Sequence, residues 1–132
     1  MMLRRTFLSG ALLCAACLPS IAKSRLADPV HSFDTDNDGT LDLNEVKKAA
    51  SATFDRLDRD HDGTLDRREL AGRLSAKELA AADPDHDGTL TKDEYLRVVE
   101  QRFQAADPDR DGTLDGKELA SRPGAALLRL MR

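Results

Sequence analysis

Four acidic segments of twelve residues, repeated at short intervals, constrain this chain more than any other feature of its sequence. They are DTDNDGTLDLNE at 34–45, DRDHDGTLDRRE at 58–69, DPDHDGTLTKDE at 83–94 and DPDRDGTLDGKE at 107–118, numbered here as loops 1 to 4. Each loop carries aspartate at positions 1, 3 and 5, glycine at position 6 and glutamate at position 12. Four copies in one short chain indicate an architecture of repeats that bury apolar surface against their neighbours.

The pattern of these loops matches the metal-binding loop of an EF-hand. Hard cations take six to eight oxygen ligands, and such a loop supplies them from positions 1, 3, 5, 7, 9 and 12. An acidic turn that binds nothing is disfavoured because all four ligand sets are complete. The candidate metal ligands are Asp34, Asp36, Asp38, Thr40, Asp42 and Glu45; Asp58, Asp60, Asp62, Thr64, Asp66 and Glu69; Asp83, Asp85, Asp87, Thr89, Thr91 and Glu94; and Asp107, Asp109, Asp111, Thr113, Asp115 and Glu118.

The charge of the loops bears on which ion they prefer. Loops 1, 2 and 4 have a fifth carboxylate at position 9, where loop 3 has Thr91. Five carboxylates repel one another around a divalent ion, whereas a trivalent ion of similar radius attracts each of them more strongly at unchanged ligand repulsion. The composition therefore favours trivalent over divalent ions. Calcium remains the alternative ligand, because calcium loops with five acids also exist.

The segments between the loops are short and predict an unusual arrangement of helices. At 12 or 13 residues each, the connectors 46–57, 70–82 and 95–106 are too short to hold two ordinary helices. We therefore expect an all-α fold, a compact bundle of short helices that carries four EF-hand loops, with adjacent hands sharing a helix. The first and third connectors have apolar residues at continuous helical spacing, which predicts two uninterrupted amphipathic helices.

The middle connector differs from the other two. Gly72 weakens its helical pattern, and the capping box that begins at Ser75 starts a new helix. We expect two short helices, 67–74 and 76–82, joined by a bend that brings loops 2 and 3 together and leaves loops 1 and 4 together at the far end. The leucine at position 8 of every loop predicts that the loops pair as short ribbons. A last helix at 122–131 carries an apolar strip, which we expect to pack into the core.

The beginning of the chain predicts export. In residues 1–22, Arg4 and Arg5 precede an apolar stretch that ends at a small-residue cleavage site, as in a secretory or twin-arginine signal. The stretch is too short for a membrane span, which needs roughly 20 residues. Both cysteines lie within it, so the mature chain would have no disulfide. We expect a flexible lead-in at 23–33 and a four-EF-hand metal-binding domain at 34–132.

Composition and motifs disfavour several classes of function. With 24 acidic and 20 basic residues, the chain is a poor candidate for binding nucleic acid. It has no nucleophile paired with a base, no phosphate-binding glycine loop and no zinc-ligand spacing, so we do not expect an enzyme. His61 and His86 occupy position 4 of their loops, which points away from the metal. Metal ions are the expected partners, and no protein partner is indicated.

Three features together resemble the lanmodulin family of exported bacterial EF-hand proteins that bind lanthanides. They are the connectors of 12 or 13 residues, the Asp-Pro-Asp openings at 83–85 and 107–109, and the tail that begins with residues 118–121. The resemblance covers the chain from Phe33 to Arg132. Position 2 is proline only in loops 3 and 4, and loops 1 and 2 have Thr35 and Arg59 there.

The resemblance implies properties beyond those that the residues indicate by themselves. It implies that positions 1, 3, 5, 9 and 12 hold the ion, that the bundle forms on metal binding, and that lanthanide(III) ions are preferred to calcium. It also implies a periplasmic protein with a role in lanthanide uptake or trafficking. The alternatives are a periplasmic calcium buffer or sensor, and an adaptor that exposes an apolar groove on metal loading. The adaptor is disfavoured because Met131 is the only methionine of the mature part.

Overall fold

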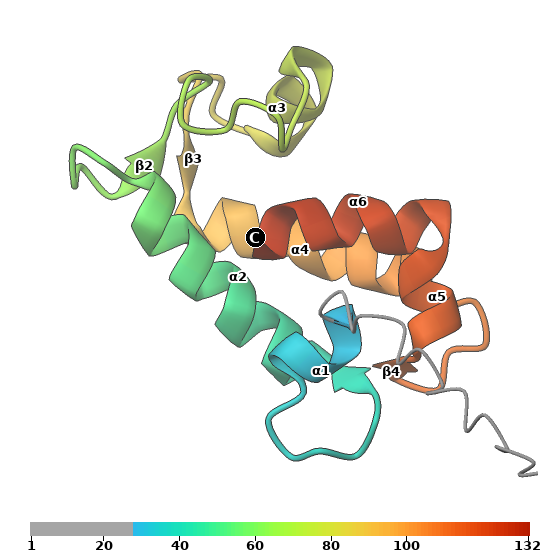
Figure 1. The fold of residues 1–132 in the computed structure, drawn as a ribbon. Helices are drawn as coiled ribbons and strands as arrows, with labels where there is room; N and C mark the ends of the chain where they lie inside the picture. Colours follow the sequence, from blue (N-terminus) through green and yellow to red (C-terminus); the bar gives the residue numbers. More distant parts are fainter. Residues whose placement is uncertain (1–27) are drawn as a thin grey trace, which may run out of the picture.

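The computed structural model describes residues 28–132, and the predicted export signal lies outside the described residues. The fold is the expected compact set of short helices with four loops between them (Figure 1). Its four strands have two residues each and belong to the loops. In chain order the elements are α1 (Pro29–Phe33), β1 (Leu41–Asp42), α2 (Leu43–Leu57), β2 (Thr64–Leu65), α3 (Ala76–Ala82), β3 (Leu90–Thr91), α4 (Lys92–Ala106), β4 (Thr113–Leu114), α5 (Gly116–Ala120) and α6 (Arg122–Met131).

The two long helices, α2 and α4, are each shared by two hands, as predicted. Helix α2 begins after Asp42 in loop 1 and ends against Asp58, the first residue of loop 2. Helix α4 begins after Thr91 in loop 3 and ends against Asp107, the first residue of loop 4. The two helices pack together, and ion pairs of 3.0 Å between Lys47 and Glu100 and 2.8 Å between Lys92 and Asp55 join them.

The loops pair as two antiparallel ribbons, which confirms the expected arrangement. Strand β1 of loop 1 pairs with β4 of loop 4, and β2 of loop 2 pairs with β3 of loop 3. The position-8 leucines meet across these ribbons, Leu41 opposite Leu114 and Leu65 opposite Leu90. All four side chains are fully buried, so each ribbon ties a pair of exposed loops to the apolar core.

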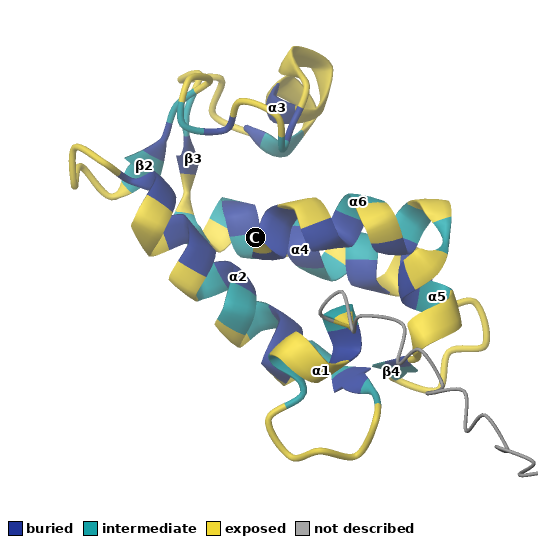
Figure 2. Ribbon diagram, in the orientation of Figure 1, coloured by how far each residue is buried: buried dark blue, intermediate teal, exposed yellow. Residues whose placement is uncertain are grey.

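Helix α6 lies along α4 and also contacts α2 (Figure 1). Its apolar strip is buried as expected, and Leu130 adds to it. The Tyr95 hydroxyl donates a hydrogen bond of 2.6 Å to the Leu130 carbonyl, and the Tyr95 ring meets Phe54 edge-on at 5.6 Å between centroids. Figure 2 shows buried residues on the facing sides of these helices and exposed residues over the loops. Within residues 28–132, no helix is long and apolar enough to cross a membrane.

The predicted helix at 67–74 is wrong. This segment forms successive turns, and only the second predicted helix, α3, is present. The Leu70 amide donates to the Asp66 carbonyl at 3.0 Å, as at the start of a helix, but Gly72 follows with a φ of 81°. A residue in this left-handed conformation ends a right-handed helix, so the chain turns before a second helical turn can form.

The second part of the flexible lead-in expected at 23–33 also needs correction, because residues 29–33 form α1, whereas residues 23–27 lie outside the described residues. The Asp28 side chain accepts a hydrogen bond of 3.2 Å from the Val30 amide and caps this helix. Pro29 stands at its start, where the fixed φ of proline suits a helix. Val30 is buried, and α1 packs against α2 and α5. Loop 1 therefore has its own short entering helix.

Candidate metal centre

Each loop brings three carboxylates together. One oxygen from each of positions 1, 3 and 12 lies within 4.8 Å of the other two. The sequence-predicted residues that meet in this way are Asp34, Asp36 and Glu45 in loop 1, Asp58, Asp60 and Glu69 in loop 2, Asp83, Asp85 and Glu94 in loop 3, and Asp107, Asp109 and Glu118 in loop 4. Among the described residues, neither His61 nor His86 joins such a cluster.

The backbone of each loop curls around its first aspartate. In loop 2 the two carboxylate oxygens of Asp58 accept hydrogen bonds from the amides of Asp62 at 3.1 Å and Gly63 at 3.0 Å. The same two positions donate to the first aspartate in the other three loops. Gly63 has a φ of 83°, a conformation that a side chain would disfavour. The glycine therefore allows the sharp turn that brings position 1 toward position 12.

The position-5 aspartates do not join the three-carboxylate clusters. In loop 2 an oxygen of Asp62 accepts hydrogen bonds from both the amide and the hydroxyl of Thr64, at 2.8 and 2.9 Å. The equivalent aspartate and threonine make the same pair of hydrogen bonds in the other loops. Position 5 thus lies at the edge of each cluster, held by the residue that is expected to offer its carbonyl at position 7.

Position 9 caps the segment that follows each loop, a helix after loops 1, 3 and 4 and a turn after loop 2, and this role was missed from the sequence. The side chains of Asp42, Asp66, Thr91 and Asp115 accept the amide hydrogen of the position-12 glutamate at 2.8, 2.9, 3.3 and 2.8 Å. In return each glutamate accepts the position-9 amide, so a capping box closes every loop. The sequence does contain the capping-box pattern, an acid or threonine three residues before each glutamate. The same residues are also metal-ligand positions 9 and 12, and they were interpreted only as ligands.

The closing glutamates differ in a second hydrogen bond. Glu45 accepts the Thr35 amide at 2.6 Å and its hydroxyl at 2.9 Å, and Glu69 accepts the Arg59 amide at 3.0 Å. These donors stand at position 2. In loops 3 and 4 position 2 is proline, which has no amide hydrogen.

Crowding of the carboxylates shifts their proton affinities in opposite directions. In loop 3 the side chains of Asp83 and Asp85 share a hydrogen bond, which lowers the pKa of Asp83 and raises the pKa of Asp85. The pKa of Asp109 in loop 4 is raised by the same kind of bond to Asp107. Each pair thus attracts a positive charge, which a proton supplies in part and a metal ion would supply in full.

The chemistry of the donors limits what these loops can hold. Each cluster offers carboxylate oxygens and no nitrogen or sulfur ligand, a set that suits hard cations and not zinc or copper. Tyr95, which follows the closing glutamate of loop 3, is buried, and burial raises the pKa of its hydroxyl to about 12. It remains a neutral phenol beside that loop at ordinary pH.

Comparison with known proteins gives the same assignment. The sequence profile of the EF-hand family matches four times, at residues 31–49, 50–71, 76–99 and 99–121. Over 72 residues the chain is 53% identical to lanmodulin of Methylorubrum extorquens, an alignment that covers 52% of this chain and 54% of that protein. The chain thus spans about half the length of the curated relative that it matches. Four acidic loops, all matched by one family profile, show that this lanmodulin-like chain is a metal-binding member of the EF-hand family.

Proposed function

We propose that this protein binds lanthanide(III) ions in preference to calcium and that binding drives its folding. The observation that carries the proposal is the meeting of three carboxylate oxygens in every loop. A fourth acid stands at position 5 of each loop, and a fifth stands at position 9 of loops 1, 2 and 4. No enzymatic activity is part of the proposal.

The proposed ligands are those predicted from the sequence, in two groups. Positions 1, 3 and 12 bind directly from near their present positions. Positions 5 and 9 now accept hydrogen bonds from the loop itself, so they coordinate after a small rotation or through a water molecule, as position 9 often does in calcium loops. The carbonyl of the position-7 threonine completes the set.

Charge supports the trivalent preference. A trivalent ion leaves a five-carboxylate loop with a charge near −2, whereas a calcium ion leaves it near −3 and less well neutralised. Ion–ligand attraction scales with the charge of the ion, while repulsion among the ligands is the same in both cases. Lanthanide selectivity should therefore be strongest in loops 1, 2 and 4.

Folding on metal binding follows from the same crowding. Without an ion, four or five carboxylates repel one another in each loop, and the apolar core that opposes this repulsion is small. Metal binding removes the repulsion, and its free energy adds to the free energy of folding. Because each ribbon joins two loops, an ion in one loop also orders its partner.

The cellular role extends the same proposal. The export signal predicted at residues 1–22 and the similarity to lanmodulin support a periplasmic protein that acts in lanthanide uptake or trafficking. A calcium buffer or sensor is the second candidate, since every ligand would also suit calcium.

Terbium luminescence tests the choice of ion. Tyr95 follows Glu94 directly, so its excitation should sensitise a terbium ion in loop 3. We expect emission to appear at low terbium concentration and to persist in a large excess of calcium. Loss of the emission at comparable calcium concentrations would reject lanthanide selectivity in favour of the calcium candidate.

A further inference from the structure

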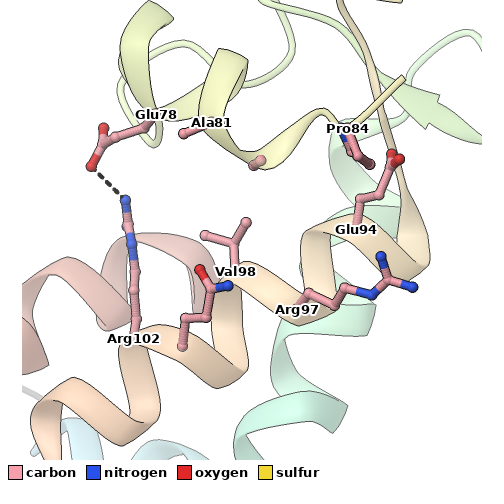
Figure 3. A pocket seen from close by; sticks show the side chains of 9 residues that line it. Glu78, Ala81, Pro84, Glu94, Arg97, Val98 and Arg102 are labelled. Carbon is pink, nitrogen blue, oxygen red and sulfur yellow. Dashed lines mark hydrogen bonds and ion pairs between the residues drawn. The ribbon is translucent and has the colours of Figure 1, made fainter. Parts of the chain in front are cut away.

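A cavity of about 340 Å³ lies between α3 and α4, directly beside loop 3. Ala81, Ala82 and Val98 give it apolar walls. Pro84 and Glu94, positions 2 and 12 of loop 3, stand at its edge (Figure 3). A molecule bound here would therefore lie next to an ion held in loop 3.

Two arginines and two acids line this cavity, and the two arginines differ in whether an acid pairs with them. The Arg102 side chain is 13% exposed and donates to the Glu78 carboxylate at 2.8 Å (Figure 3). It also donates to the Ala126 carbonyl at 2.6 Å. Arg102 is thereby fixed in place and its charge is matched by Glu78. Arg97 is exposed and forms no hydrogen bond or ion pair with any residue that the structure describes. Its guanidinium, one helical turn after Glu94, is free to bind an anion.

Loop 3 is also the loop that least repels an anion. It has four carboxylates, because Thr91 stands where the other loops have aspartate. A trivalent ion would leave it with a charge near −1, compared with −2 in the other loops. The Thr91 hydroxyl already accepts the Glu94 amide, so loop 3 has one ligand oxygen fewer to offer the ion.

We propose that this cavity binds a small oxygen-donor anion of the dicarboxylate class, which pairs with Arg97 and supplies a ligand to the ion in loop 3. The anion displaces water from the ion, and no bond of the protein changes. Loop 3 is then the place where an ion passes between the protein and a chelating carboxylate. This inference rests on the proposed function, because it requires an ion in loop 3.

The luminescence lifetime of terbium excited through Tyr95 provides the test, with malonate as the probe. Water bound to terbium shortens this lifetime, so an anion that replaces water lengthens it. We expect a saturable lengthening in the wild-type protein. Arg97→Gln should raise the malonate concentration at half effect by about two- to fivefold, the range for an exposed ion pair. Lys77→Gln, which makes the same charge change on the exposed face of α3, should leave that concentration unchanged.

Thr91→Asp provides a second variant that keeps the cavity intact. Its added carboxylate restores the ligand and the charge of the other loops, so we expect terbium to bind and malonate to have no effect on the lifetime. A lifetime that never responds to malonate, or that responds equally in all variants, overturns the inference and leaves the proposed function standing. Absence of emission excited through Tyr95 without malonate would instead contradict the proposed function at loop 3.

Discussion

In loops 1 and 2 the closing glutamate accepts hydrogen bonds from more backbone amides than it does in loops 3 and 4. Glu45 and Glu69 each accept two backbone amides, from positions 2 and 9. Glu94 and Glu118 accept only the position-9 amide, at 2.7 and 2.9 Å. The difference comes from proline at position 2, which removes one donor. A single residue type thus divides four nearly identical loops into two kinds.

This division shows how the metal-free loops compete with the ion. An amide that binds a carboxylate satisfies part of the charge that the metal would otherwise satisfy, so loops 1 and 2 gain less when they bind. Each ribbon joins one loop of each kind, loop 1 with loop 4 and loop 2 with loop 3. We therefore infer that a proline loop fills first in each pair and orders its partner.

Removal of a closing glutamate should have the largest effect. Glu94→Gln and Glu45→Gln should each weaken metal binding in their own loop by more than about 100-fold, because residues that merely orient ligands already contribute 10- to 100-fold. Without metal, the two variants should differ in their free energy of unfolding. Glu45→Gln weakens several charged hydrogen bonds and should lower the free energy of unfolding by about 1 kcal/mol more than Glu94→Gln. Because the metal-free chain is expected to be largely unfolded, urea denaturation in chelator with a stabilising osmolyte such as TMAO measures this difference, and equal values would contradict the comparison.

Gly124 provides the next test, because it packs against Glu118 and Leu119, where loop 4 ends and α5 continues. A methyl group added there would overlap the Glu118 carbonyl oxygen and lie 2.5 Å from the Leu119 Cα. Gly124→Ala should therefore separate α6 from α5 and destabilise the fold by about 1–3 kcal/mol. Calorimetric titration should show the loss of affinity at loop 4 first. Gly116→Ala is the matched control, since its methyl group meets nothing within 4 Å. Equal destabilisation by both variants would contradict the claim that close packing at Gly124 supports loop 4.

Exchange of the position-2 residues tests the division itself. Pro84→Ala restores an amide donor and should weaken metal binding in loop 3 by about two- to tenfold, the range for one hydrogen bond. Arg59→Pro removes a donor and should strengthen loop 2 by a similar factor. Arg59→Ala controls for loss of the arginine side chain. If the two substitutions both raise or both lower metal affinity, the position-2 amide does not cause the difference between the two kinds of loop.

A fall in pH should reduce metal affinity in all four loops alike, so it should produce the smallest difference between the two kinds of loop. The pKa of Asp85 in loop 3 is raised by its hydrogen bond with Asp83, and the pKa of Asp60 in loop 2 is raised by burial and by its acidic neighbours. Metal affinity should fall in both kinds of loop as pH decreases through these raised values. Terbium titrations at a series of pH values measure this fall. A steeper fall of metal affinity in the loops with proline, or in those without it, would show that protonation also differs between the two kinds of loop.

For the metal-free protein, a fall in pH has the opposite effect at Asp85, because it increases the stability of the fold. Because the folded-state pKa of Asp85 lies above its ordinary value of 3.8, its protonation stabilises the metal-free fold below pH 3.8. That contribution is lost as pH rises through the raised pKa. The lowered pKa of Asp83 acts in the reverse sense and offsets part of it. Thermal melts in chelator, with the same osmolyte to populate the metal-free fold, should therefore change less with pH than metal affinity does.

Much of the fold was predictable because connector length leaves few choices. Twelve residues hold one helix, so α2 and α4 had to be shared, and the bend expected between 67–74 and 76–82 paired the loops as observed. The periodicity of 67–74 predicted a helix because it counts apolar positions and not φ values, so one left-handed glycine was enough to end it. Helix α1 was missed because five residues are too few for a periodic pattern, and the structure shows that the Asp28 cap and the burial of Val30 stabilise it.

The ligand positions were predictable from spacing, but their present hydrogen bonds were not. Spacing places positions 1, 3 and 12 together, and the structure agrees. Spacing cannot show that Asp62 accepts a hydrogen bond from the Thr64 amide, that Asp66 caps the turn after loop 2, or that the Arg59 amide donates to Glu69. These bonds depend on side-chain rotamers and on single backbone amides, which a ligand motif does not describe.

Parallel titrations of the metal-free mature chain with lanthanum and calcium, followed by circular dichroism, test both lanthanide selectivity and folding on metal binding. We expect little helical signal in chelator. We also expect a sharp gain that saturates near one lanthanum ion per loop, and a comparable gain only at far higher calcium concentrations. Equal responses at equal concentrations of the two ions would contradict lanthanide selectivity, and a full helical signal in excess chelator would contradict folding on metal binding.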